Sequence, residues 1–254
     1  MKIASWNVNS LNVRLPHVLA WLDSAKPDIL AIQETKLSDD KFPVEALQQA
    51  GYESVYAGQK TYNGVAIISL KPATDVVTDV DGLDDPQRRI LAATIDGIRV
   101  INLYVVNGKE VGSDKFAYKL DWLEHVTAFI ADQMKIHDKV VVLGDFNIAP
   151  EDRDVHDPAL WHEKILCSTP ERNALRKILD LGLSDTFRQF EQAEESWSWW
   201  DYRMASFRRN LGLRIDLVLA SAAMGKLCTA AYIDVEPRRQ ERPSDHTPVV
   251  AEFN

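Results

Sequence analysis

The sequence of 254 residues contains little cysteine and no long apolar run. Its two cysteines, Cys167 and Cys228, are far apart and lack metal-ligand spacing, which excludes a small disulfide-stapled fold. No apolar stretch approaches the roughly 20 residues that span a bilayer, so we expect no membrane partner. The first residues show no basic region followed by an apolar stretch and a cleavage site. We therefore expect a bacterial-type cytoplasmic protein with reduced thiols.

Low-complexity segments, linkers and short repeats are also absent, and the 11 glycines and 11 prolines are scattered. A hydrophobic content of 46% with 26% charged residues excludes a disordered or collagenous chain. The length favours one layered domain over residues 1–254, which we expect to be monomeric. Positive charge is in deficit, since 29 Lys and Arg against 38 Asp and Glu give a net charge of −9. Taken alone, this value argues against a nucleic-acid partner.

Short β-branched apolar runs alternate with longer amphipathic segments. Such runs predict strands at residues 3–8, 29–33, 65–70, 98–106, 140–143 and 215–219, and helical spacing predicts helices at 13–24, 116–134 and 172–181. Ser113 and Asp114 offer a cap for the second helix, and Pro170 suits the opening turn of the third. Residues 52–106 contain four or five strand-like runs and no convincing helix, which disfavours strictly alternating βαβ units. The pattern predicts a mixed-sheet α/β sandwich whose sheet pair is covered by helices.

Polar side chains gather where the apolar runs stop. In open α/β folds the rim of the sheet binds ligands, although Asp and Asn also mark strand ends simply because they favour turns. Several such ends carry hard oxygen donors, which suit Mg²⁺ or Mn²⁺ and suit zinc poorly: Asn7, Glu34, Asp145, Asn147 and Asp245. Carboxylates converging without a cation would repel one another. The set therefore predicts a Mg²⁺-dependent phosphoryl-transfer site.

One histidine, His246, accompanies these donors. An acidic partner on one ring nitrogen would fix its tautomer and favour the charged form, and either Asp216 or Asp245 could supply it. A cationic imidazole can then stabilise the extra charge of a phosphoryl-transfer transition state.

Aromatic and basic residues cluster near these segments. Three tryptophans fall within residues 197–200, where we expect Trp197 or Trp200 to be core and Trp199 to face substrate. Basic side chains lie close to the site segments in sequence, and although a charge cluster is often only a solvated face, their placement favours a rim that contacts phosphates: Lys36, Arg88, Arg89, Lys115, Lys119, Arg203, Arg208, Arg209, Arg214, Arg238, Arg239 and Arg242.

Six ordered blocks, spanning almost the whole chain, resemble the exonuclease III family of abasic-site endonucleases. They are Ile3–Ser10, Pro27–Lys36, Gly144–Asn147, Trp199–Arg203, Leu213–Asp216 and Ser244–His246. The resemblance implies a DNase I-like, four-layered α/β sandwich of two packed mixed sheets flanked by helices. It also implies Mg²⁺-dependent cleavage on the 5′ side of abasic sites, with 3′-5′ exonuclease or 3′-phosphodiesterase activity, as in base excision repair.

The resemblance also implies roles for individual residues. Glu34 would be the principal metal ligand, helped by Asn7 and Asp245. Asp145 would activate or hold the attacking water, with Asn147 orienting it or binding the phosphate. Asp216 would orient His246 toward the scissile phosphate.

Further roles follow for the substrate. Tyr104 matches the family's active-site tyrosine, although Val106 stands where the family commonly has proline. Asn107 would lie beside the phosphate, and Trp199 would line the pocket for the abasic deoxyribose. A tyrosine packed in a strand is the simpler alternative for Tyr104 alone.

The expected partner is double-stranded DNA with abasic sites or blocked 3′ ends, contacted by residues such as Lys36, Arg203 and Arg209. Such a protein would be cytoplasmic and associated with the nucleoid. The net charge does not exclude it, because only a local basic rim is needed and Glu34 and Asp145 belong to the acidic total. Two alternatives remain: the same machinery acting on another phosphoester, or an inactive module that binds damaged DNA.

Overall fold

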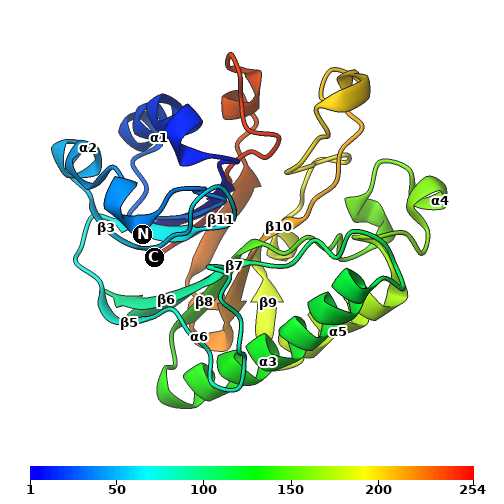
Figure 1. Ribbon diagram of the computed structural model, residues 1–254, viewed down its shortest axis with the longest axis horizontal. Coiled ribbons are helices and arrows are strands. Elements are labelled where there is room, and N and C mark those ends of the chain that lie inside the picture. The colour runs from blue at the N-terminus through cyan, green and yellow to red at the C-terminus, as the bar shows by residue number, and fades with distance from the viewer.

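Two six-stranded sheets pack against each other in a computed structural model that describes residues 1–254 (Figure 1). The strand order of the first sheet is β11–β12–β1–β2–β4–β3. Its strands, in that order, are Cys228–Ile233, Val249–Phe253, Lys2–Asn7, Ile29–Gln33, Val65–Ser69 and Glu53–Ala57. Only β1 and β2 pair in parallel, so the sheet is mixed.

The second sheet has the order β5–β6–β7–β8–β10–β9. Its strands, in that order, are Thr74–Val77, Ile90–Ile95, Ile98–Tyr104, Val140–Asp145, Asp216–Ser221 and Leu183–Asp185. Here β7 and β8 form the parallel pair. The five strands β3 to β7 follow one another with no intervening helix, as the sequence predicts for residues 52–106.

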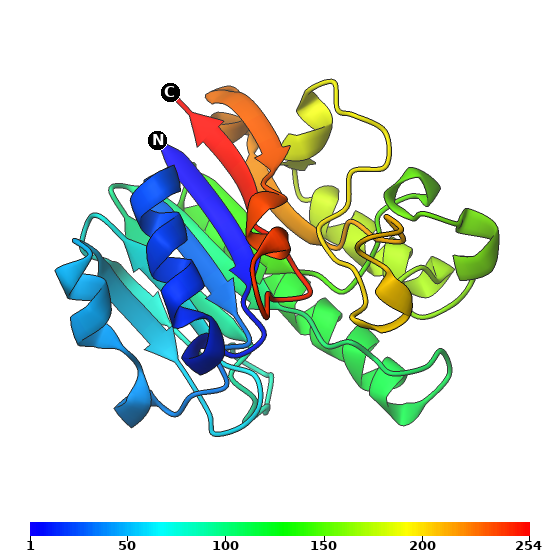
Figure 2. The ribbon, with the colours of Figure 1, turned by 90° about the horizontal axis from the view of Figure 1, so that it is seen from above.

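Helices complete a four-layered arrangement. α1 (Leu11–Ala25) and α2 (Val44–Gln49) lie on the outer face of the first sheet, and α3 (Asp114–Ile136) and α5 (Thr169–Leu179) lie on that of the second (Figures 1 and 2). Two short helices, α4 (Pro158–Trp161) and α6 (Ala222–Gly225), lie outside these layers. None of the helices is long and apolar enough to cross a membrane. The predicted α/β sandwich is confirmed.

Three apolar clusters hold the layers together. The central cluster joins the facing sides of the sheets, for example Ile67 and Ala31 of the first with Val141 and Leu143 of the second. The two outer clusters bury one side of α1 and one side of α3 against their sheets. Several central strands are buried on both faces, which explains why their sequences are almost entirely apolar.

Helix ends follow the local signals in the sequence. The Ser113 side chain accepts a hydrogen bond from the Phe116 amide and caps α3, as predicted. α5 begins at Thr169, three residues before the predicted start, because Ser168 and Glu171 form a capping box around Pro170. Side-chain caps thus fix where the two helices begin.

Candidate active site

Polar residues from both sheets meet at one end of the molecule. The parallel pairs β1–β2 and β7–β8 direct their carboxyl ends to this edge. β10 runs antiparallel to β8 and places Asp216 opposite Asp145. β12 is antiparallel to β1, so the turn before it carries His246 to the same edge. The topology therefore gathers residues from opposite ends of the sequence, since Asn7 ends β1 and His246 comes just before β12.

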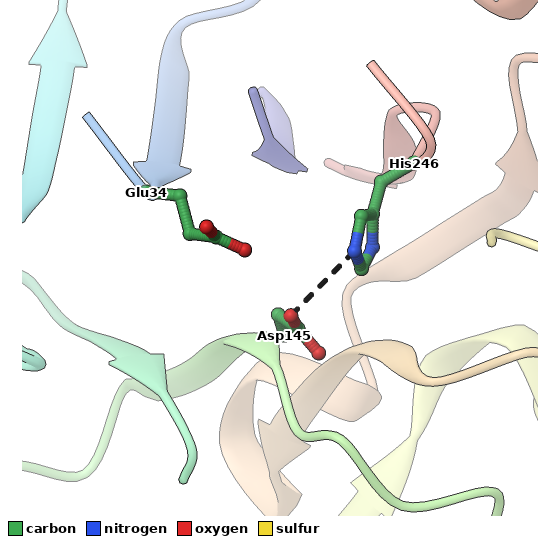
Figure 3. A group of neighbouring side chains, drawn as sticks. All are labelled: Glu34, Asp145 and His246. Atoms are coloured by element: carbon green, nitrogen blue, oxygen red, sulfur yellow. Dashed lines mark ion pairs between the residues drawn. The ribbon is translucent and has the colours of Figure 1, made fainter. Parts of the chain in front are cut away.

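Glu34, Asp145 and His246 point toward one another (Figure 3). One ligand atom from each lies within 4.8 Å of the others, so the two carboxylates could share a metal ion beside the imidazole. Glu34 follows β2 of the first sheet, whereas Asp145 ends β8 of the second. Glu34 has a φ of +54° and Asn147 one of +49°, a left-handed conformation that costs energy in non-glycine residues and clusters at functional sites.

A glycine allows β8 to approach β7 just before Asp145. Gly144 has a φ of +145°, and a Cβ on it would lie 1.9 Å from the Leu103 carbonyl oxygen. No other residue fits this position without moving the strand. The glycine of the Gly-Asp-Phe-Asn motif thus has a packing role: it lets β8 lie close to β7 just before the Asp145 carboxylate.

His246 is oriented by Asp216, which decides between the two acidic partners considered from the sequence. The ring Nδ1 lies 2.9 Å from Asp216 Oδ2, and Nε2 lies 3.7 Å from Asp145 Oδ2. Burial alone lowers the pKa of His246, but the carboxylates of Asp216 and Asp145 outweigh it and raise the pKa to about 10. The imidazole is therefore charged at neutral pH.

Asp145 is buried and surrounded by hydrogen-bond donors. Its Oδ2 accepts from the Asn7 amide at 2.9 Å, and its Oδ1 accepts from the Asn147 backbone N–H at 2.9 Å. Burial raises the pKa of Asp145 to about 7, and the charge of His246 opposes that shift. A carboxyl that titrates near neutrality is well suited to exchange a proton with water.

Asn7 holds the two carboxylates together. Its amide nitrogen donates to Glu34 Oε1 and to Asp145 Oδ2, both at 2.9 Å, while its oxygen accepts from the Asn9 N–H at 3.0 Å. In this arrangement the nitrogen faces the carboxylates and the oxygen, the atom that would bind a metal, faces away. The predicted ligand role of Asn7 stays a prediction.

Asn147 links Asp145 to the loop after β7. Its amide nitrogen donates to the Val105 carbonyl at 3.0 Å and to Asp145 Oδ2 at 3.2 Å. Its oxygen accepts from the Asn107 side chain at 3.0 Å. The structure thus brings the two predicted phosphate-contacting asparagines, Asn107 and Asn147, into direct contact.

Tyr104 lies at the end of β7. The Arg89 guanidinium lies over the Tyr104 ring, 4.4 Å from the ring centre. Burial raises the pKa of Tyr104 well above its usual value, and the nearby charge of Glu34 and its hydrogen bond with the tyrosine add to that effect. The phenol is therefore protonated at neutral pH and acts as a donor.

Asp245 lies beside the central group and has other partners. Its Oδ1 accepts from Asn9 at 2.9 Å and its Oδ2 from the Trp199 indole at 3.0 Å. The Lys36 ammonium pairs with Glu34 at 2.9 Å and donates to Asn9 Oδ1 at 2.5 Å. Lys36 is thus in the site, whereas the ligand role of Asp245 stays a prediction.

Two of the three tryptophans are buried, as expected, and the substrate-facing role of Trp199 stays a prediction. Trp197 and Trp200 are buried, and Trp199 is half-buried with its ring centroid 6.5 Å from that of His246. Arg203 and Arg209 are exposed on the segment that follows, where the Arg203 guanidinium pairs with Asp201 at 2.7 Å.

Three basic residues assigned to the phosphate-contacting rim are buried instead, which corrects that prediction. Arg214 pairs with Asp154 and Asp185, each at 2.7 Å, beneath the sheet edge. Arg238 stacks on Phe207, 4.9 Å from its ring centre. Lys119, the third, is fully buried. Proximity in sequence to a site segment did not distinguish these inward-facing cations from exposed ones.

Two contributing residues escaped the sequence analysis. Ser198 donates to Asp216 Oδ2 at 2.7 Å, and the same hydroxyl accepts from the Asp216 N–H at 3.1 Å. Asn9 connects Lys36 to Asp245, as described above. Ser198 lies between Trp197 and Trp199 in the sequence. In an extended segment this spacing predicts that the Ser198 side chain points to the opposite side from the two tryptophans, and it is the one sequence signal for this residue.

Two packed mixed sheets with a carboxylate–imidazole cluster at their common edge define an α/β-sandwich hydrolase. The chain belongs to the Endonuclease/Exonuclease/phosphatase family, whose model matches residues 4–246. The resemblance to the exonuclease III family is confirmed. The chain is 34% identical over 268 residues to "Exodeoxyribonuclease III" of Haemophilus influenzae, covering 100% of both proteins.

Solved structures share the fold. The 3′ phosphatase NExo from Neisseria, bound to a product DNA hairpin, is 54% identical with a TM-score of 0.98, and the match covers 100% of this chain and 99% of that one. An AP endonuclease from Archaeoglobus fulgidus is 40% identical with a TM-score of 0.96, covering 100% and 99%. The DNase I-like architecture expected from the sequence is therefore confirmed.

Proposed function

We propose that this protein is a Mg²⁺-dependent DNA-repair nuclease that hydrolyses the phosphodiester 5′ to abasic sites and phosphoesters at 3′ ends. The observation that carries the proposal is the convergence of Glu34, Asp145 and the Asp216-oriented His246 at one edge of the sheets. The relatives support both activities, since their names include a 3′ phosphatase and an AP endonuclease.

The donor set fits a hard divalent cation. Glu34 and Asp145 offer carboxylate oxygens within one small volume, and burial together with the charge of Asp216 disfavours an ionised Asp145 unless positive charge is near. We assign Glu34 and Asp145 as the residues that hold Mg²⁺. When bound, the ion would polarise a phosphate oxygen.

The protein's own groups divide the remaining work. The charged His246 donates a hydrogen bond to a phosphate oxygen and stabilises the negative charge that develops there. The Tyr104 phenol, protonated at neutral pH, is a second donor. Asp145 accepts the proton of the attacking water, and the Asn147 N–H keeps its carboxylate aligned.

Trp199 is the residue we assign to recognition of the abasic sugar. Its indole is fixed by Asp245 beside His246, so a flat apolar surface adjoins the reacting groups. Lys36, Asn107, Arg203 and Arg209 would contact phosphates around it. Replacing Trp199 by Ala should reduce abasic-site cleavage more than 3′-end processing, and equal losses would mean that Trp199 is structural.

The test uses two duplexes, one with an internal abasic analogue and one with a nick ending in a 3′ phosphate. We expect both to be processed in Mg²⁺ and neither in EDTA. Glu34→Gln should abolish both activities while the melting temperature in EDTA changes little. Intact substrates in Mg²⁺ would refute the proposal and point to another phosphoester or to an inactive DNA-binding module.

A further inference from the structure

Lys119 is a buried lysine that the reaction outlined above does not use. Lys119 is on α3, its side chain is fully buried, and its ammonium has three hydrogen-bond acceptors. These are Glu171 Oε1 at 2.5 Å, the Asn147 carbonyl at 2.7 Å and the Asn107 carbonyl at 3.2 Å. All three ammonium protons therefore have partners, which is the condition for burying such a charge at tolerable cost.

Glu171 is itself fixed in place. Its Oε2 accepts from the Ser168 hydroxyl at 2.6 Å and from the Ser168 N–H at 3.1 Å, forming the capping box of α5. Its Oε1 also accepts from the Leu166 N–H at 3.1 Å. The start of α5 thus presents an immobile carboxylate to Lys119.

The two carbonyls bound by Lys119 belong to residues of the candidate active site. Asn107 and Asn147 are joined by their side chains at 3.0 Å, and Asn147 also holds the Asp145 carboxylate. Asn147 has a left-handed backbone conformation, with a φ of +49°, which asparagine adopts more readily than other non-glycine residues. A Cβ on Gly108 would approach the Lys119 side chain to 3.0 Å, so the lysine packs directly against this loop.

We infer that Lys119, whose buried charge Glu171 balances, is a positioning residue that holds the loops carrying Asn107 and Asn147 in register with Asp145. The inference rests on the proposed function for its effect on catalysis. A buried ion pair adds little stability over apolar side chains of similar volume, but its removal from one side is costly. The pair supplies a fixed three-way geometry that an apolar contact could not.

Three variants separate positioning from stability. Lys119→Met leaves Glu171 buried without its partner, so we expect a lower melting temperature and a lower kcat. Lys119→Met combined with Glu171→Gln removes both charges, and we expect much of the melting temperature to return. Its kcat on the 3′-phosphate duplex should stay at least about tenfold below wild type, with KM changed less than about threefold, because the loops lack their anchor. Lys135→Met, at the exposed far end of α3, is the matched control and should resemble wild type.

The outcomes are decisive in either direction. Recovery of kcat together with the melting temperature in the double variant would show that the ion pair is only structural. If neither Lys119 variant folds, Glu171→Gln alone keeps the ammonium on both carbonyls, so it should lose stability without a tenfold loss of kcat. A tenfold loss there would overturn the inference.

A readout without substrate keeps the two proposals distinguishable. Hydrogen exchange of residues 144–149 should be faster in the folded double variant than in Lys135→Met. Glu171→Gln, which keeps Lys119 on both carbonyls, should exchange in this segment at the rate of Lys135→Met. Unchanged exchange in the double variant would contradict the positioning role. Failure of the wild-type protein to process either duplex would refute the proposed function and leave the exchange result to judge Lys119.

Discussion

The imidazole of His246 owes its charge to neighbours on a different sheet. Burial favours the neutral ring, whereas Asp216 and Asp145, both from the second sheet, favour the cation and prevail. Ser198 in turn orients Asp216 through its hydroxyl. A chain of three side chains therefore keeps a hydrogen-bond donor facing the position where we place the phosphate.

Replacing Asp216 by Asn should lower the pKa of His246 from about 10, because burial would then act against the charged ring with less compensation. NMR titration of the imidazole in EDTA buffer measures this directly. We also expect kcat to fall by at least about tenfold at neutral pH. Asp132→Asn, on the exposed surface of α3, is the control. An unchanged pKa of His246 would contradict the assignment.

The same substitution has a defined effect on stability. The pKa of His246 in the folded state lies above that of an unfolded histidine, about 6.5, so its contribution to stability is complete below pH 6.5 and is lost as the pH rises toward 10. The melting temperatures of wild type and Asp216→Asn in EDTA should therefore differ most below pH 6.5. The difference should shrink as the solution becomes alkaline.

Sequence patterns located the central residues of the candidate site more reliably than the residues around them. Glu34, Asp145 and His246 follow or precede apolar strands, so their location at the sheet edge was predictable. The choice of Asp216 over Asp245 depended on strand pairing, which no local pattern specifies. The burial of Lys119 and Arg214 depended on distant acidic partners, Glu171 for the first and Asp154 and Asp185 for the second.

At the scale of elements, one strand–helix–strand unit supports each half of the site. β1–α1–β2 ends at Asn7 and Glu34, and β7–α3–β8 ends at Tyr104 and Asp145. Both units place a parallel strand pair under a covering helix. The apolar periodicity of these segments made them predictable, whereas α2 and the short helices α4 and α6 lack enough residues to show a period.

The contact between β7 and β8 provides a test at this scale. Gly144→Ala should lower the free energy of unfolding by more than about 2 kcal/mol, because its Cβ would collide with the Leu103 carbonyl. Gly182→Ala is a matched control with a φ of +102° and nothing within 4 Å of the added Cβ, so we expect a loss of about 1 kcal/mol. Urea denaturation measures both. Equal losses would mean that backbone conformation, not the close approach of strands, requires Gly144.

At the scale of the whole molecule, charge is distributed unevenly. The net charge is −9, yet exposed arginines follow Trp199 on the segment beside the site. Exposed arginines near the site would attract DNA phosphates, whereas the acidic rest of the surface would repel them. This combination favours weak DNA binding that is quickly reversed. The net charge sums the whole surface, so its value of −9 does not exclude the proposed DNA partner, which needs only a local basic rim.

Binding to a duplex should therefore weaken steeply with salt. Arg209→Ala should reduce the slope of log K against log [NaCl] by about 0.9, the value for one lost phosphate contact. Arg176→Ala, on the exposed side of α5 in the outer layer, should leave the slope unchanged. Fluorescence anisotropy at several NaCl concentrations measures both variants. A slope equal to wild type in Arg209→Ala would remove Arg209 from the interface.

The apolar layer between the sheets has a mechanical consequence. Glu34 follows a strand of one sheet and Asp145 ends a strand of the other, and the side chains of the central cluster fill the space between the two sheets. Hydrostatic pressure, which compresses such packing, would change the spacing between the two carboxylates. We therefore expect the rate of turnover to change when the interior is compressed, at pressures below those that unfold the chain.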